Sequence, residues 1–391
     1  MKKYNKNFLF ITGSRSEYGL LSGLIKMCKK NRSIKTSLMV TGSHFSKKFG
    51  NTVDEIKNDN IKIDFKINLK NNFETKKDII FSFSKNLIYY HKYLSHKKPN
   101  LIILLGDRHE IFSAAIVAMF LGIPVAHIHG GELTEGSYDD NIRHSITKLS
   151  HYHFVANKIF KRRIVQLGEN PKSIFIVGGL GVDNIKNNVF LKKQELEKLL
   201  NIKFEKYNFL ITFHPATLSH NVNLIIFKNL IKNLNIIKNT NFIFTFPSAD
   251  PGSSELINEL KNFKKKNKNV FIFKSLGNKN YLSLLKQVDL VLGNSSSGIS
   301  ETPTFKIPTI NIGDRQKGRL FAKNIIQSNG SYYDIKKKIY KSLSKNFLDS
   351  IKNTLNPYGK GGAHKKIFKL LCEINFSRNV IKKKFYDLKN E

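Results

Sequence analysis

A regular alternation of short apolar runs with amphipathic stretches, along almost the whole chain, constrains the fold most. The runs show no polar alternation, so each would be buried on both faces, as are strands of a parallel sheet covered by helices. They lie at 8–12, 37–41, 101–105, 123–127, 153–156 and 174–178 in the first half and at 209–213, 242–246, 270–273, 290–293 and 307–313 in the second. Helical patterns lie between them, for example at 109–121, 140–150, 220–235 and 280–287. The alternation predicts an α/β protein with two doubly wound, Rossmann-like domains.

The length of 391 residues is enough for two ordinary domains. The segment 179–206 has no clear strand and carries the polar stretch LGVDNIKNN, so it is the predicted junction. A second turn-rich break, NPYGKGGAH, lies at 356–364. We therefore expect one domain over 1–182 and another over 183–364. Ligands of such sheets bind beyond the carboxyl ends of the strands, so the residues that follow strands matter most.

Composition limits the class of protein. The formal charge of +37 would favour nucleic acid or an anionic membrane if it were clustered, but the lysines are scattered and their short runs carry no interleaved aromatic residues. A lysine-rich surface with a general attraction for anionic substrates explains the charge better. Two distant cysteines, Cys28 and Cys372, fit a reducing compartment rather than a disulfide or zinc scaffold. No stretch approaches the ~18–20 apolar residues of a membrane span, so we expect a cytoplasmic protein that binds neither membrane nor specific nucleic acid.

The stretch GNSSSGISE at 293–301 follows an apolar run and begins a predicted helix. Small residues at such a turn let main-chain N–H groups approach a phosphate closely, and the helix dipole assists. Glu301, further into that helix, would accept hydrogen bonds from ribose hydroxyls. The structural alternative is a serine-rich N-cap without a ligand. This motif indicates a phosphate site more strongly than any other in the chain.

Two motifs of the first half also follow apolar runs directly. GSRSEYG at 13–19 matches neither GxGxxG nor GxxxxGK[ST], but Arg15 is placed to meet a phosphate, unless it is a surface residue of a plain turn. In GDRHE at 106–110, Asp107 either serves chemistry at the edge of the sheet or caps the next helix. Arg108 beside it would hold the carboxylate ionised or contact a ligand.

Two motifs of the second half have the same position. In HPATLS at 214–219, His214 would donate a hydrogen bond to a phosphate or exchange a proton near neutral pH, although a single histidine is more often structural. GDRQKGR at 313–319 presents Arg315 and Arg319 either to the space between the domains or to solvent.

The stretch VAHIHGGELTEGSYDDNIRH at 125–144 is dense in acids and histidines. On a strand, the spacing of His127 and His129 would point both rings to one face. With Glu132 and His144 they form a possible zinc or iron ligand set, although no compact fourth-ligand pattern is present.

The alternative for the same stretch is a proton-transfer site without a metal. The acids Glu132, Asp139 and Asp140 outnumber what one such metal needs. At the start of the following helix, Asp140 would share a face with Arg143 and with His144. Spacing alone leaves both the metal site and the acid/base site open.

Taken together, the motifs are specific. GSRSEYGLL, LLGDRHEIFSAA, IPVAHIHGGE, YDDNIRHSITKLSHYHF, RRIVQLGE, TFHPATLS, GNSSSGISE, NIGDRQKGR and NPYG occur in this order. From residue 8 to about 365 the chain resembles the hydrolysing UDP-N-acetylglucosamine 2-epimerases of sialic- and nonulosonic-acid synthesis. The resemblance implies two domains of the GT-B type, a substrate in the cleft between them, and a last helical stretch over 365–391 that packs back on the first domain.

The reaction that the resemblance implies couples inversion at C2 to the loss of UDP. A base removes the C2 proton while UDP leaves C1, giving a glycal, and water then adds at C1 while a proton returns to C2 from the other face. The products are N-acetylmannosamine and UDP. The family needs neither a metal nor a nicotinamide cofactor.

Residue roles follow from the matched motifs. Asp107, Glu132 and Asp140 resemble the acid/base carboxylates, and His214 the histidine near the diphosphate. The groups that would bind UDP are Arg15, Ser296, Ser297, Gly298 and Glu301, with Arg108, Arg143, Arg315 and Arg319 as further cleft contacts. Where non-hydrolysing cousins carry a glutamate, this chain has His129, so either His129 or Glu132 would take over that proton transfer.

Several alternatives stay open at this point. Within the enzymes, the nearest is a hydrolysing 2-epimerase of UDP- or GDP-N,N'-diacetylbacillosamine for legionaminic acid synthesis, and a non-hydrolysing epimerase or another GT-B glycosyltransferase fits the motifs less well. From another class comes a basic protein that binds nucleic acid without catalysis. The resemblance also implies a homodimer or homotetramer.

Overall fold

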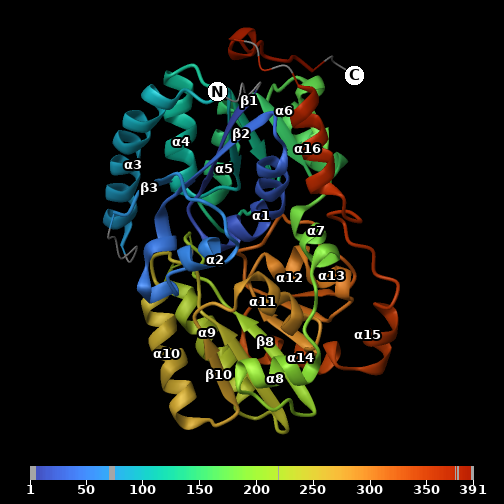
Figure 1. The fold of residues 1–391 in the computed structure, drawn as a ribbon. Helices are drawn as coiled ribbons and strands as arrows, with labels where there is room; N and C mark the ends of the chain where they lie inside the picture. Colours follow the sequence, from blue (N-terminus) through green and yellow to red (C-terminus); the bar gives the residue numbers. More distant parts are fainter. Residues whose placement is uncertain (1–5, 70–74, 219, 375, 377, 389–391) are drawn as a thin grey trace.

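The computed structural model describes residues 6–69, 75–218, 220–374, 376 and 378–388. Two parallel sheets, each flanked by helices, lie one above the other with the connecting helix α7 (Leu180–Asn187) at their side (Figure 1). We call residues 6–176 together with helix α16 (Ala363–Glu373) the N-lobe, and residues 193–350 the C-lobe. The predicted α/β class with two doubly wound sheets is confirmed.

The N-lobe sheet has seven parallel strands in the order β3-β2-β1-β4-β5-β6-β7. Its strands are β1 (Lys6–Thr12), β2 (Ile34–Val40), β3 (Phe65–Lys66), β4 (Leu101–Leu105), β5 (Val125–Ile128), β6 (Tyr152–Val155) and β7 (Ile174–Ile176). Its helices are α1 (Arg15–Lys30), α2 (Val53–Asn58), α3 (Lys76–Lys97), α4 (His109–Phe120), α5 (Asp139–Leu149) and α6 (Lys158–Gln166), with 3-10 turns at Gly42–Phe45, Lys47–Phe49 and Pro171–Ser173.

Strand β1 shows why this sheet needs apolar residues at successive positions. Phe8 and Phe10 pack on one face with residues of α1 and α16, whereas Leu9 and Ile11 pack on the other with residues of α3 and α4. Both faces are covered, so the strand has no polar side.

The C-lobe sheet has six parallel strands in the order β10-β9-β8-β11-β12-β13. They are β8 (Tyr207–Thr212), β9 (Thr240–Thr245), β10 (Val270–Phe273), β11 (Leu290–Gly293), β12 (Thr309–Ile312) and β13 (Ile325–Ser328). The helices are α8 (Lys193–Leu200), α9 (His220–Leu234), α10 (Ser253–Lys266), α11 (Gly277–Leu285), α12 (Ser297–Ser300), α13 (Thr302–Phe305), α14 (Tyr332–Ser342) and α15 (Lys345–Ser350). Helices α9, α10 and α14 cover one face, and α8 and α11 the other.

Both sheets reverse their strand order at one point, between β1 and β4 and between β8 and β11. In open α/β sheets the loops that leave such a point diverge to opposite faces and open a crevice between them. The motifs GSRSEYG, GDRHE, HPATLS and GNSSSGISE follow these four strands. The topology therefore places four sequence motifs at two crevices.

Helix α16 returns to the N-lobe, where Ile367 and Leu371 join the core on the α1 side of the sheet (Figure 1). It ends at Glu373, well before residue 388, and the chain continues as a 3-10 turn at Arg378–Ile381 and an extended tail. The expected helical stretch over 365–391 is thus wrong in its extent, and its last residues, 389–391, lie outside the described residues.

Sequence patterns missed two short strands. β3 has only two residues, and the edge strand β13 reads IIQS, so neither forms an apolar run like those of the other strands. The predicted domain boundary after residue 182 falls inside α7, and the division at that position stays a prediction. Among the described helices, none is both long and apolar enough to cross a membrane.

Candidate active site

A cavity of about 330 Å³ lies between the lobes. It is walled by the loops that follow β1, β4 and β5 on the N-lobe side and β8, β9, β11 and β12 on the C-lobe side. It brings together twelve of the residues that the motifs single out: Arg15, Asp107, Arg108, His129, Glu132, Arg143, His214, Ser296, Ser297, Glu301, Arg315 and Arg319. Two others, Asp140 and Gly298, are not part of its lining.

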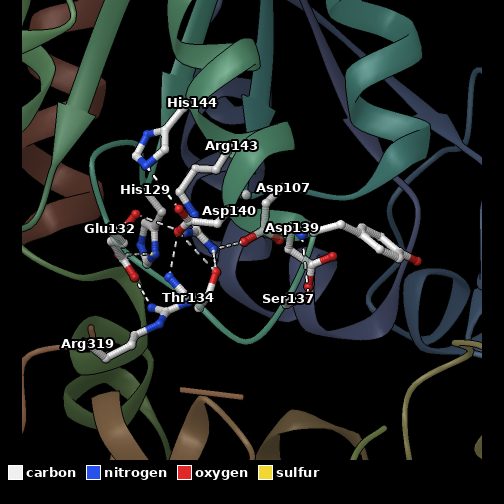
Figure 2. Close-up of polar contacts among 12 residues, drawn as sticks. Asp107, His129, Glu132, Thr134, Ser137, Asp139, Asp140, Arg143, His144 and Arg319 are labelled. Atoms are coloured by element: carbon white, nitrogen blue, oxygen red, sulfur yellow. Dashed lines mark hydrogen bonds and ion pairs between the residues drawn. The ribbon is translucent and has the colours of Figure 1, made fainter. Parts of the chain in front are cut away.

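Arg143 is the centre of the N-lobe wall and is only 1% exposed. Its guanidinium pairs with Asp107 and donates hydrogen bonds to the Glu132 carbonyl at 2.9 Å and to Thr134 Oγ1 at 3.0 Å (Figure 2). A rigid fork of N–H donors suits this task, because one side chain binds groups of two loops at once. Arg143 therefore holds the end of β4 and the loop after β5 in one arrangement.

The pKa values of Asp107 and Asp139 are shifted in opposite directions. Burial raises the pKa of Asp107, but the guanidiniums of Arg143 and Arg319 outweigh it and hold the pKa below its usual range. For Asp139, burial and then the charge of Asp107 raise the pKa to about 7. One carboxyl is therefore ionised while its neighbour holds a proton for much of the time near neutral pH.

The expected catalytic role of Asp140 does not match its position. Asp140 Oδ1 accepts a hydrogen bond from the Thr134 main-chain N–H at 2.6 Å and one from Arg143 at 3.3 Å, and its other oxygen lies 3.5 Å from His144 Nε2 (Figure 2). These bonds turn its side chain into the loop, and the preceding residue, Asp139, lines the cavity instead. Consecutive positions on a helix differ by about 100° in direction, so only one of the two can face the cleft.

Glu132 joins the lobes. It is 1% exposed, pairs with Arg319 of the C-lobe, and lies 3.3 Å from His129 Nδ1 through its other oxygen (Figure 2). Burial, followed by the charges of Arg319 and Arg143, lowers the pKa of His129 to about 4. His129 is thus neutral at physiological pH, and the Glu132 side chain lies between a guanidinium and this neutral imidazole.

The two histidines of VAHIHGGE do not face the same way. Strand β5 ends at Ile128, and His129 takes a left-handed conformation with φ of 68°, which turns its ring into the cleft. His127 is fully buried, with Nε2 2.8 Å from the Gly106 carbonyl and Nδ1 3.1 Å from Thr147 Oγ1. The expectation of one shared face is wrong because the strand ends between them.

His214 follows β8 and forms part of the C-lobe wall. Asn294, which follows β11, holds the His214 main chain through two hydrogen bonds of 2.6 and 2.8 Å. Arg315 Nη1 and Gln316 Nε2 donate to the Asn294 carbonyl at 3.1 and 3.0 Å. Burial, with Arg315 next in effect, holds the pKa of the His214 imidazole well below its usual range.

The turn GNSSSGISE presents Ser296 and Ser297 to the cavity. Ser297 Oγ donates to Glu301 at 2.5 Å and lies 2.7 Å from Tyr281 OH. Gly298 lies behind them, where a Cβ would come within 3.1 Å of Thr309 Cγ2. The missing Cβ lets helix α12 approach β12 closely, and the expected contact of Gly298 with UDP stays a prediction.

Arg15 contacts the C-lobe directly in this structure. Its guanidinium donates to the carbonyls of Lys274 at 2.6 Å and Phe246 at 3.3 Å. The side chain lines the cavity, so it belongs to the cleft as expected, but its present partners are main-chain oxygens.

Some lining residues were missed by the sequence motifs. Glu17 lines the cavity, and burial raises its pKa to about 8. Ser248 and Asp250, in the stretch FPSAD, also line it. Ser248 and Asp250 could have been predicted from the sequence, because they follow the apolar run 242–246 just as the recognised motifs follow other apolar runs.

Comparisons with known proteins identify the family of this chain. The sequence profile of the UDP-N-acetylglucosamine 2-epimerase family matches residues 26–372. The chain is 41% identical to the Campylobacter jejuni GDP/UDP-N,N'-diacetylbacillosamine 2-epimerase (hydrolyzing) over 98% of this chain and 99% of that protein. It is 38% identical to the Escherichia coli polysialic acid biosynthesis protein P7, over 98% of both chains.

Among solved structures, the fold is similar to that of the Neisseria meningitidis UDP-GlcNAc 2-epimerase bound to UDP-GlcNAc. The TM-score is 0.79 with 18% sequence identity, over 94% of this chain and all of that one. That level of identity supports the fold, and the family match with the two relatives supports the activity class. The chain belongs to the UDP-N-acetylglucosamine 2-epimerase family and is a nucleotide-sugar 2-epimerase.

Proposed function

We propose that the protein is a hydrolysing UDP-N-acetylglucosamine 2-epimerase that converts UDP-GlcNAc and water to N-acetylmannosamine and UDP. The observation that carries the proposal is one cavity in which an ionised Asp107 and a proton-holding Asp139 face His214 and the serine turn of the C-lobe. The name of the E. coli relative assigns that protein to polysialic acid biosynthesis, and N-acetylmannosamine is the sugar from which sialic acids are built.

In the first step, the C2–H bond and the bond from C1 to the UDP oxygen break, and a C1=C2 double bond forms. Asp107 is the base that takes the C2 proton, and Arg143 fixes the orientation of its carboxylate. Such a base must point at the proton and be kept from water. UDP carries away the electron pair of the broken C–O bond. The bond changes balance without an oxidant, so the proposed step needs no nicotinamide.

In the second step, water adds its oxygen to C1 and a proton adds to C2 from the opposite face. Asp139 donates that proton, since its carboxyl stays protonated up to about pH 7. Glu132, beside the neutral His129, orients the water and accepts its proton. The product has the manno configuration and a free C1 hydroxyl.

The C-lobe stabilises the charge that grows on the diphosphate as UDP leaves. His214, Arg315 and the hydroxyls of Ser296 and Ser297 line that side of the cavity. Donors that are already in place lower the barrier without reorganising during the reaction. Glu301, which accepts a hydrogen bond from Ser297, also accepts hydrogen bonds from the ribose.

The second candidate substrate is UDP- or GDP-N,N'-diacetylbacillosamine. The Campylobacter jejuni relative, whose name carries this substrate and the word hydrolyzing, supports it at 41% identity. Both substrates undergo the same bond changes, so the acid/base wall serves either. They differ at C4 and C6 of the sugar, away from the reacting carbons.

The test is to incubate the purified protein with each nucleotide sugar in D₂O, with and without EDTA. We expect release of UDP and a manno-configured sugar carrying deuterium at C2, from UDP-GlcNAc at a higher kcat/KM than from the diacetamido sugar. The reverse ratio would establish the second candidate, and UDP-ManNAc without free UDP would mean a non-hydrolysing enzyme. Activity that EDTA abolishes would restore a metal site.

Asp107→Asn is the matched control, since it removes the base and leaves the C-lobe intact. It should abolish turnover while UDP still binds. Salt-sensitive binding of nucleic acid without turnover of either sugar would favour the basic binding protein. A homodimer or homotetramer and a cytoplasmic location stay predictions.

A further inference from the structure

Ser248 and Asp250 follow β9 and stand in the cavity wall beside His214. Strands β8 and β9 are neighbours in the sheet, so their carboxyl ends bring the two loops together. None of the recognised motifs includes this pair. Their contacts run from the C-lobe wall to the N-lobe wall.

The Ser248 main-chain N–H donates to His214 Nδ1 at 2.8 Å. An imidazole nitrogen that accepts a hydrogen bond carries no proton, so the neutral ring holds its proton on Nε2. Burial and the nearby cations Arg315, Arg15 and Arg108 keep the imidazole neutral, with a pKa well below its usual range. His214 is thereby set as a donor from Nε2, suited to an anionic ligand.

The Ser248 hydroxyl completes the arrangement. Its Oγ donates to Asp250 Oδ2 at 2.5 Å and lies 3.1 Å from His214 Nδ1. Because the hydroxyl proton goes to the carboxylate and Nδ1 carries none, the approach of Oγ to Nδ1 is not a hydrogen bond, and the Ser248 main-chain N–H is the donor that orients the ring. Asp250 therefore fixes the rotamer of Ser248, and the loop position in turn fixes the ring of His214.

The second oxygen of Asp250 reaches across the cleft. Asp250 Oδ1 lies 3.6 Å from Arg108 Nη1, which belongs to the N-lobe, and the two side chains are 13% and 15% exposed. Arg108 also binds Glu110 of its own lobe through Nε at 3.1 Å. Asp250 is thus the C-lobe partner of a guanidinium that is otherwise anchored in the N-lobe, and the contact bridges the cleft.

We propose that Asp250 is a positioning residue that couples closure of the cleft, through Arg108, to the orientation of His214, through Ser248. The inference rests on the proposed function, because His214 is taken to meet the diphosphate. When the lobes part, Asp250 loses Arg108 and the Ser248 loop is released. When they close, the His214 donor is locked before UDP begins to leave.

Substitutions separate the two halves of the coupling. Asp250→Asn keeps an acceptor for Ser248 but loses the charge that holds Arg108, whereas Ser248→Ala keeps the main-chain donor to His214 and loses the link to Asp250. Asp250→Ala loses both links. We expect UDP affinity to fall roughly tenfold in Asp250→Ala and less in each single-link variant, with Asp250→Glu restoring part of it.

The experiment measures UDP binding by calorimetry, and kcat and KM for the substrate, in Asp250→Asn, Asp250→Ala, Ser248→Ala and the double alanine variant. Non-additive losses in the double variant would show that the two residues act as one chain. The matched control is Asp289→Asn, a C-lobe carboxylate that binds the Asn208 main chain at 2.8 Å and is not part of the cavity lining. It should alter stability and leave UDP affinity unchanged.

A pH profile adds a readout that a purely structural role would not move. Besides burial, the charges of Asp107 and Asp250 raise the pKa of Asp139, while Arg315 and a bond to Ser137 lower it. Asp250→Asn should therefore lower the pKa of Asp139, so the decline of kcat at high pH should begin at a lower pH. Asp289→Asn should not shift it.

The inference is overturned if Asp250→Asn and Asp250→Ala both bind UDP like the wild type, whatever their melting temperature and pH profile. Neither UDP binding nor the change in radius of gyration, measured by solution scattering on adding UDP, requires turnover. If the wild type turns over neither sugar, the proposed function fails while these two measurements still decide the role of Asp250.

Discussion

Arg143 and Asp107 form a buried ion pair that ties the start of helix α5 to the end of strand β4. Arg143 is nearly inaccessible, and Asp107 keeps one face toward the cavity. The pair therefore does two things at once, since it stabilises the loops of the N-lobe wall and keeps the base ionised.

Replacing Arg143 by Gln should leave Asp107 without its cation, so the pKa of Asp107 should rise and the acid limb of kcat/KM should move to higher pH. Removing one partner of a buried pair should also cost on the order of 3 kcal/mol in the free energy of unfolding. Urea denaturation and a pH–rate profile measure the two effects. Arg162→Gln, on the exposed face of α6, is the control that should change neither.

Asp139 and Asp140 should respond differently to the same substitution. Asp139→Asn removes the proton donor, and turnover should fall by about 100-fold or more while UDP binding persists. Asp140→Asn retains an acceptor for the Thr134 N–H and leaves the carboxyl of Asp139 in place. Its kcat should therefore fall much less than the kcat of Asp139→Asn. Equal losses of kcat in both variants would contradict the assignment of the donor to Asp139.

The pH dependence of kcat follows from the ionisation of Asp139. Its pKa is raised to about 7, and a proton donor reacts only in its protonated form, so kcat should decline as pH rises above about 7. The residual activity of Asp139→Asn should lack that decline. A wild-type profile that is flat between pH 6 and 9 would be inconsistent with this role.

Glu169 should control acid stability far from the cleft. Burial raises its pKa, but hydrogen bonds from His153, Lys383 and Lys148 outweigh it and lower the pKa to about 2. Its folded pKa lies below the unfolded value of about 4.3, so its contribution is present above that pH and is lost as pH falls toward 2. Glu169→Gln should flatten this acid loss of stability in denaturation curves, whereas Glu373→Gln, an exposed carboxylate on α16, should not.

Gly23→Ala should destabilise the protein, although alanine normally favours a helix interior over glycine by about 1 kcal/mol. A Cβ at this position of α1 would lie 2.8 Å from the His364 ring of α16. The ring cannot turn away, since Nε2 is 2.9 Å from the Leu20 carbonyl and Nδ1 is 3.2 Å from Asp183. Thermal unfolding should show a lower Tm, and Ser22→Ala on the same helix should not.

The sequence by itself determined the two doubly wound sheets and the order of the cleft motifs. Strands buried on both faces need consecutive apolar residues, and that requirement is local, as at 101–105 and 209–213. Residues that follow such strands lie at the edge of the sheet where ligands bind, so the sequence predicts Asp107 and His214 at two such edges, and the resemblance to the epimerase family implies that the two edges share one cleft. Strands β3 and β13 were missed because neither forms an apolar run.

Only the tertiary structure decided which neighbouring side chain faces the substrate. The choice of Asp139 over Asp140 depends on how α5 is rotated when Arg143 binds the loops after β4 and β5. The divergence of His127 and His129 depends on where β5 ends. The contacts of Glu132 with Arg319, and of Arg108 with Asp250, join segments of different lobes across the cleft. Such contacts depend on position in space, and local sequence patterns carry no information about them.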